Sequence, residues 1–255
     1  MPRIKKVLAI IVVVGIVAGA YFLIRIAPVY TTDNTGAEKV VLLHGFGRTD
    51  MSMLLLNSAL TAAGYDVYSL EYPSIEETPE ALVEIVGEEI NNCCKNGEKT
   101  VHFVGHSLGG LLLRDYLGRH RQGNLGHVVL IGSPNKGSEL ADADLDIAAQ
   151  ETMLGWAGPS AQALHTGPDG YAASLPAPDY TVGVIAGNRG NHVSDNWLPT
   201  PNDGVVSVES ARLDGMTDFI AVDVTHWDMR SSPVVADLVI DFLGHGRFNY
   251  ERESL

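Results

Sequence analysis

The chain has 255 residues, enough for one α/β domain with a substantial core. Its 31 acidic and 17 basic residues give a net charge of −14, and so acidic a surface excludes nucleic acid as a partner because it would repel the phosphate backbone. The two cysteines, Cys93 and Cys94, are adjacent, which fits no spaced metal or redox motif and is a poor arrangement for an ordinary disulfide. A vicinal or intermolecular bridge remains the alternative.

An uncharged apolar segment, Val7 to Ile24, has the length of a short membrane-spanning helix. The basic residues of this region lie mainly before it: Arg3, Lys5 and Lys6. By the positive-inside rule the N-terminus stays in the cytoplasm and the rest of the chain lies outside the cytoplasmic membrane. We therefore expect a signal-anchor over residues 1–27 and a polar linker over 28–38. The alternative is a signal peptide cleaved near Ala18-Gly19-Ala20, after which the protein is secreted.

Residues 39–245 alternate between strand-like and helix-like segments, which predicts a mostly parallel sheet covered by helices on both faces. The buried-strand runs are 40–43, 65–70, 101–104, 127–131, 180–186 and 219–224, and helical patterns follow most of them. An insertion over about 139–178 contains no strand-like run and is expected above the sheet. The polar tail, 246–255, is expected to be loose.

The sequence V-G-H-S-L-G-G predicts a nucleophilic serine at Ser107. A short apolar strand precedes it and a Leu-rich helix follows it, so the G-x-S-x-G turn would lift the serine hydroxyl above the sheet edge. Gly105 and Gly109 let such a strained turn close without a clash. A Gly-rich loop with an ordinary capping serine is the simpler alternative. His102 and His106 need no role, since one lies in the strand and the other fills the variable position of the motif.

A serine hydroxyl needs a base, and the base needs an orienting carboxylate. Asp203 stands in a tight Asn-Asp-Gly turn and His226 follows the last strand, which completes the chain order serine, acid, histidine. Loops at the carboxyl ends of parallel strands open on one edge, where the three side chains can meet. Asp203 could instead only shape its turn, and His226 could be a surface histidine. The competing residues are Asp195, Asp214, Asp228, His192 and His245.

Acyl transfer also needs two NH donors for the oxyanion. We assign them to the backbone of Leu108, which follows the nucleophile, and of Phe46, in the His44-Gly45-Phe46-Gly47 loop after the first strand. The glycines on either side of Phe46 would let the backbone approach a ligand closely. A simple Gly-rich turn is the alternative for this loop.

Together these motifs resemble a bacterial lipase or esterase of the α/β-hydrolase superfamily. The matching segments are V-V-L-L-H-G-F-G, V-G-H-S-L-G-G, L-I-G-S-P-N-K-G-S and N-D-G-V-V-S-V-E-S-A. Asn135 stands where similar lipases have a histidine. The resemblance implies a reduced α/β-hydrolase sheet of about six strands, and a lid or acyl-pocket wall built by the insertion.

The expected activity is hydrolysis of carboxylic esters through an acyl-enzyme, with an ester or lipid as substrate and no cofactor. An acyltransferase using the same residues is the alternative, and a binding module that has kept only the fold is a third reading. The acidic run Asp142, Asp144 and Asp146 lacks the glycine and glutamate of a calcium loop, so we expect a solvated patch and no metal. Nothing in the sequence sets the length of the acyl chain.

Overall fold

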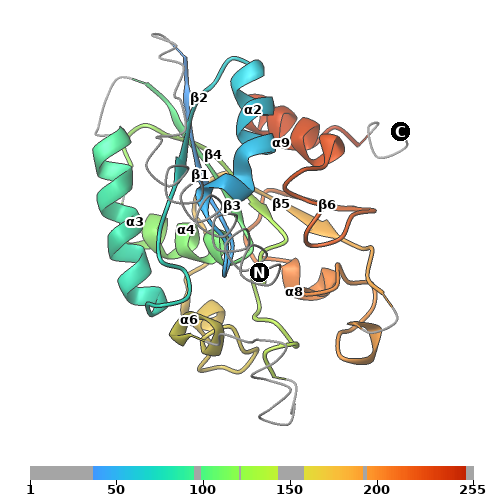
Figure 1. Ribbon diagram of the computed structural model, residues 1–255. Helices are drawn as coiled ribbons and strands as arrows, with labels where there is room; N and C mark the ends of the chain where they lie inside the picture. Colours follow the sequence, from blue (N-terminus) through green and yellow to red (C-terminus); the bar gives the residue numbers. More distant parts are fainter. Residues whose placement is uncertain (1–36, 95–98, 121, 143–157, 192–193, 251–255) are drawn as a thin grey trace, which may run out of the picture. The chain divides into compact units, whose positions relative to one another are not determined.

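The computed structural model describes residues 37–94, 99–120, 122–142, 158–191 and 194–250. Six parallel strands form one sheet in the order β2-β1-β3-β4-β5-β6 (Figure 1), which confirms the predicted parallel sheet. The strands are β1 (Lys39–Leu43), β2 (Asp66–Leu70), β3 (Val101–His106), β4 (Leu125–Ile131), β5 (Val182–Gly187) and β6 (Asp218–Val222). Because all strands run the same way, the loops that follow them meet at one edge.

Two pairs of helices cover the sheet (Figure 1). Helices α2 (Leu54–Ala62) and α9 (Pro233–His245) contact each other, as do α3 (Pro79–Cys94) and α4 (Leu108–Arg119). The remaining short elements are η1 (Asp50–Met53), α6 (Pro159–Gln162), α7 (Tyr171–Ser174), η2 (Ser194–Asn196) and α8 (Val208–Ala211). Asp50 is the first residue of the 3₁₀ turn η1, whose N-cap is Thr49.

The continuous apolar run of β1 follows from burial on both faces. Successive side chains of a strand point to opposite sides, and Val41 and Leu43 join the hydrophobic cluster that contains residues of α3 and α4. Val40 and Leu42 join a second cluster that contains residues of α2 and α9. Each face of the sheet thus has its own hydrophobic layer. The close-packed sheet forms a rigid support for the loops at the carboxyl ends of its strands.

The predicted anchor and most of the linker, residues 1–36, lie outside the described part of the chain. Within the described ranges no helix is both long and apolar enough to cross a bilayer. The membrane anchor therefore stays a prediction from the sequence.

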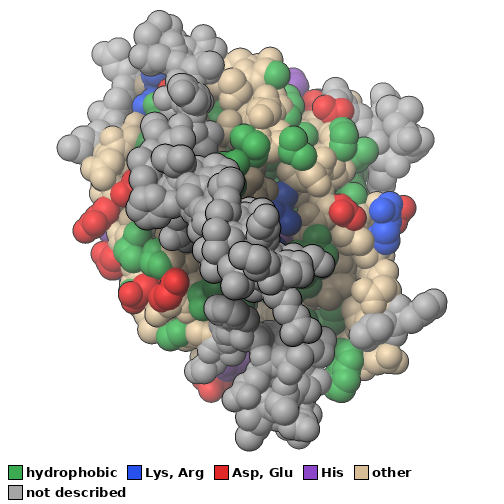
Figure 2. Space-filling model, in the orientation of Figure 1, with side chains coloured by type: hydrophobic (Ala, Val, Ile, Leu, Met, Phe, Trp, Pro, Cys, Tyr) green, Lys and Arg blue, Asp and Glu red, His purple; other side chains and the backbone are tan. Residues whose placement is uncertain are grey.

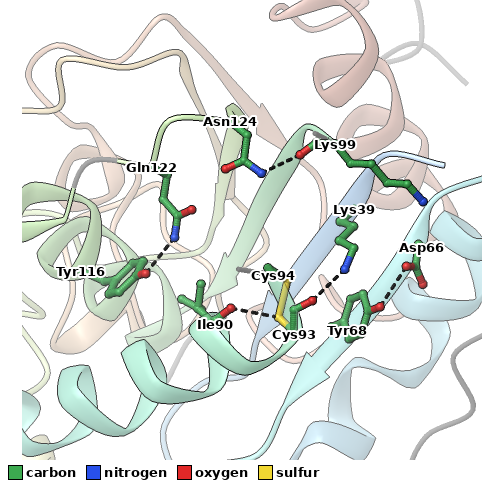
Figure 3. Close-up of a disulfide and its surroundings, with 10 residues drawn as sticks. All are labelled: Lys39, Asp66, Tyr68, Ile90, Cys93, Cys94, Lys99, Tyr116, Gln122 and Asn124. Atoms are coloured by element: carbon green, nitrogen blue, oxygen red, sulfur yellow. Dashed lines mark hydrogen bonds between the residues drawn. A yellow bond between two sulfur atoms is a disulfide. The ribbon is translucent and has the colours of Figure 1, made fainter. Parts of the chain in front are cut away.

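Cys93 and Cys94 form a vicinal disulfide at the end of α3 (Figure 3). The expectation that neighbouring cysteines suit no ordinary disulfide therefore gives way to the vicinal alternative. Lys39, the first residue of β1, donates a hydrogen bond from its ammonium group to the carbonyl of Cys93 at 2.7 Å, which ties the end of the helix to the start of this strand.

The segment after α9 is packed where the sequence predicted a loose tail. Phe248 is 3% exposed and its ring lies 4.8 Å from that of Phe242 in α9. The backbone NH of Phe248 also donates to the carboxylate of Asp218 at 2.9 Å. The polar segment has only two aromatic residues, Phe248 and Tyr250, which set up no helical or strand periodicity, so the sequence pattern could not reveal this packing.

Replacing Phe248 with alanine should therefore destabilise the whole domain. Truncation of a buried phenylalanine costs about 3–5 kcal/mol, because transfer energy is lost and a cavity is left. Urea denaturation of wild type and Phe248→Ala measures the difference, with the exposed neighbour Arg247→Ala as the matched control. Equal free energies of unfolding for the three proteins would show that the segment after α9 contributes nothing to the core.

Candidate active site

Ser107 lies in a sharp turn between β3 and α4. It has φ 56° and ψ −124°, and among the described residues it is the one non-glycine residue with a positive φ. Such a conformation costs about 1–3 kcal/mol, so the surrounding structure must hold it in place. The strand before it is buried throughout, and Ser107 itself is 8% exposed. The geometry is that of the predicted G-x-S-x-G turn.

The two glycines of the motif are required by close backbone packing. A Cβ on Gly105 would lie 2.6 Å from the backbone of Gly110. A Cβ on Gly109 would lie 2.5 Å from the carbonyl oxygen of His44. No side chain fits at these distances, so both positions need glycine to let α4 start directly against the sheet.

The structure brings Ser107, His226 and Asp203 together. His226 Nε2 lies 3.1 Å from the Ser107 hydroxyl oxygen, and His226 Nδ1 lies 2.8 Å from Asp203 Oδ2. A carboxylate only accepts hydrogen bonds, so Nδ1 carries the proton and Nε2 is left to accept from the serine hydroxyl. Both the histidine and the aspartate are buried, at 3% and 2% exposed. The arrangement can move a proton from Ser107 to His226.

The two carboxylate oxygens of Asp203 have different partners. Oδ1 accepts from the backbone NH groups of Val205 and Val206 at 2.9 and 2.7 Å and shapes the turn. Oδ2 faces His226, whose own backbone NH donates to the Asp203 carbonyl at 2.9 Å. The turn therefore fixes the carboxylate in the orientation that holds the imidazole.

The competing acids and histidines lie elsewhere. Asp195 accepts from the side chain of Asn202 at 3.0 Å and so supports the turn before Asp203. Asp228 is exposed and accepts from Thr225, and Asp214 is exposed. His245 is exposed at the end of α9, and His192 lies outside the described residues.

His106 has a role that sequence reasoning missed. Its Nε2 lies 3.1 Å from the carbonyl oxygen of His226, and the two rings are 4.8 Å apart. Burial, then the charges of His226 and Arg230, hold the pKa of His106 well below its usual value. The neutral ring donates a hydrogen bond to the backbone carbonyl of His226, the predicted base. No local pattern signals this, since the two residues are 120 positions apart.

The loop after β1 lies directly against the nucleophile. A Cβ on Gly45 would come within 2.9 Å of the Ser107 Cβ, so the backbone touches the turn without a side chain between them. Gly47 has φ 64°, and its NH donates to the Ser74 hydroxyl at 3.0 Å. Phe46 stands between these two fixed points and lines the pocket. Leu108 is the first residue of α4, where backbone NH groups have no intrahelical acceptor.

His44, at the start of this loop, fixes the loop through its contacts with Tyr72 and Gly45. Its ring is fully buried and stacks on Tyr72 with centroids 4.0 Å apart, while the Tyr72 hydroxyl donates to the His44 carbonyl. His44 Nδ1 lies 2.9 Å from the carbonyl oxygen of Gly45. Burial lowers the pKa of His44 to about 4. The ring is therefore neutral at physiological pH.

A pocket of about 500 Å³ opens beside Ser107. Most of its walls are apolar, and the predicted insertion contributes Leu140, Ala141, Ala161 and Leu164. These described residues of the insertion thus form one wall of the pocket. Ser160 in α6 fixes this wall by donating a hydrogen bond to the carbonyl of Ser74 at 2.6 Å. The lining fits an acyl or alkyl chain.

Two further sequence features have structural roles. The Asn135 side chain donates to the Ala211 carbonyl at 2.7 Å, and the buried guanidinium of Arg114 donates to the Asn135 carbonyl at 3.1 Å. Asp142 accepts from the backbone and hydroxyl of Thr166, while Asp144 and Asp146 lie outside the described residues. In the described ranges no group of three or more acidic, histidine or cysteine side chains could hold a metal ion.

A model of the alpha/beta hydrolase family matches residues 40–252, and the chain belongs to that family. The match covers the six strands, except Lys39 at the start of β1, together with Ser107, Asp203 and His226. It therefore agrees with the resemblance that the motifs indicated. No curated protein sequence matches the chain.

Solved structures share the fold. The mature lipase BlEst2 of Bacillus licheniformis is 18% identical with a TM-score of 0.67, over 86% of this chain and 95% of that one. The phospholipase PlaB of Legionella pneumophila is 15% identical with a TM-score of 0.65, over 86% and 61%. The metagenomic carboxyl esterase MGS0156 is 16% identical with a TM-score of 0.61, over 76% and 66%. At these identities the likeness establishes the fold alone.

Acid should destabilise the domain through His44. Between pH 6.5 and about 4 the unfolded chain binds a proton there that the folded chain does not, so the free energy of unfolding falls as the pH falls through this range. We expect wild type to lose up to about 1.4 kcal/mol per pH unit more than His44→Phe, measured by urea denaturation at pH 7, 6 and 5. The control is His245→Asn, whose exposed imidazole is solvated in both states. Identical slopes for wild type and His44→Phe would contradict the prediction.

Proposed function

We propose that the protein is a serine hydrolase that cleaves carboxylic esters through an acyl-enzyme. The observation that carries the proposal is the hydrogen-bonded series from Asp203 through His226 to Ser107, at 2.8 and 3.1 Å. An apolar pocket beside the serine and the lipase, phospholipase and esterase among the solved neighbours support an ester as substrate. Together they favour ester hydrolysis over a retained fold without activity.

In the proposed mechanism, the Ser107 oxygen attacks the ester carbonyl carbon while its proton passes to His226 Nε2. The carbonyl oxygen becomes an oxyanion, which the NH groups of Phe46 and Leu108 would hold. Collapse of this intermediate breaks the bond to the alcohol, which leaves with the proton from His226. Water then attacks the acyl-enzyme, again giving its proton to His226, and the carboxylic acid leaves as Ser107 regains its proton.

Replacing Ser107 with alanine should lower kcat on p-nitrophenyl esters by at least about a thousandfold, because the acyl-enzyme can no longer form. A fluorophosphonate probe should label wild type at Ser107 and leave the variant unlabelled. Circular dichroism of both proteins controls for folding. Full esterase activity in Ser107→Ala would refute the proposed mechanism.

An acyltransferase is the alternative, in which an alcohol or lipid acceptor resolves the same acyl-enzyme. The two activities share every catalytic residue, so only the products separate them. Hydrolysis releases free acid even when a lipid acceptor is present in excess, whereas transfer yields a new ester. Product analysis of wild type under these conditions decides between them.

The proposed location rests on residues 1–27 alone. A single N-terminal helix would keep the catalytic domain on the outer side of the cytoplasmic membrane. Protease added to intact cells or spheroplasts should therefore digest residues 39–245, with a cytoplasmic protein as the protected control. Protection of the domain would contradict this location.

A further inference from the structure

An arginine stands at the rim of the catalytic pocket. The guanidinium carbon of Arg48 lies 4.7 Å from the centroid of the Trp227 ring, and both residues line the pocket with Ser107. Trp227 is 51% exposed, so the pair lies where the pocket meets solvent. Among the described lining residues Arg48 carries the one permanent charge, and none of them has an acidic side chain.

Arg48 is exposed and has no carboxylate within salt-bridge distance among the described residues. Three other described arginines are paired with carboxylates: Arg189 with Asp223 at 2.9 Å, Arg119 with Asp115, and Arg212 with Glu209 at 3.9 Å. Acidic side chains are scattered over the face drawn in Figure 2, so carboxylates are abundant on the surface. A guanidinium held over an aromatic ring by a cation–π contact makes no hydrogen bond in that contact, so its NH donors can bind a planar anion.

A second cation, Arg230, contacts the backbone of Trp227. Arg230 donates to the carbonyl oxygens of Trp227 at 3.2 Å and Ser52 at 3.3 Å, so it holds the Trp227 loop through backbone groups. Burial lowers the pKa of His106, and the charges of Arg230 and Arg48 lower it further. The field of both arginines thus reaches the ring next to the nucleophile.

We propose that Arg48, held over Trp227, binds an anionic group of the ester substrate, a carboxylate or a phosphate, while the apolar part of the substrate fills the pocket. The inference rests on the proposed function and narrows it to anionic esters. A bidentate contact between the guanidinium and either anion satisfies the free donors. Neutral esters of the same shape lack this contact.

The test compares pairs of esters in which one member carries an anionic group and the other is neutral. For the carboxylate, mono-p-nitrophenyl glutarate is paired with its methyl-capped diester. For the phosphate, a monoacylglycerol 3-phosphate is paired with the same monoacylglycerol. The measured quantity is the ratio of kcat/KM for the anionic ester to that for its neutral partner, at low ionic strength, in wild type, Arg48→Gln, Arg48→Lys and Arg247→Gln.

We expect Arg48→Gln to lower this ratio about tenfold for at least one pair, and added salt to weaken the preference of wild type. The pair that responds identifies the anion. Arg48→Lys should keep part of the preference, because it retains the charge without the bidentate fork. The control Arg247→Gln removes an exposed arginine outside this pocket and should leave the ratio unchanged.

A ratio within twofold of wild type for both pairs in Arg48→Gln overturns the inference. If wild type still cleaves the neutral esters, the proposed function stands without it. Failure of wild type to cleave any of the four esters overturns both.

Discussion

Close packing of backbone around Ser107 is the constraint on which the rest of the site depends. The serine has a positive φ, which a residue with a side chain adopts only when its surroundings impose it. Gly109 lies against the carbonyl of His44, and Gly45 lies against the Ser107 Cβ, so β1, β3 and α4 meet without intervening side chains. The two hydrophobic layers hold these elements together, and their stability maintains the strained turn.

The polar groups beside the serine are also held in fixed positions, by hydrogen bonds. Each oxygen of Asp203 has its own partners, the turn on one side and His226 on the other. His226 is held at three points: its NH by Asp203, its carbonyl by His106 and its ring by the carboxylate. A buried polar group without a partner would cost about 1–3 kcal/mol, so these bonds also favour one orientation of the imidazole.

Charge is distributed unevenly between surface and pocket. The chain carries a net charge of −14, yet the described walls of the pocket contain no carboxylate, and Arg48 stands at its rim. An acidic surface repels anions at long range, and a local guanidinium still binds them because screening shortens the reach of the distant charges. The protein can thus have a negatively charged surface and still offer a local contact for one anionic group in its pocket.

The sequence by itself determined the order of the strands and helices, because buried parallel strands leave continuous apolar runs. It also marked Ser107 by its G-x-S-x-G motif, Asp203 by its Asn-Asp-Gly turn and His226 by its place after the last strand. Only the tertiary structure decided the contacts of His106, the packing of Phe248 and the position of Arg48 over Trp227. These contacts join residues far apart in the chain, and the order of strands in the sheet brings them together. No local pattern records which distant residue will be the neighbour.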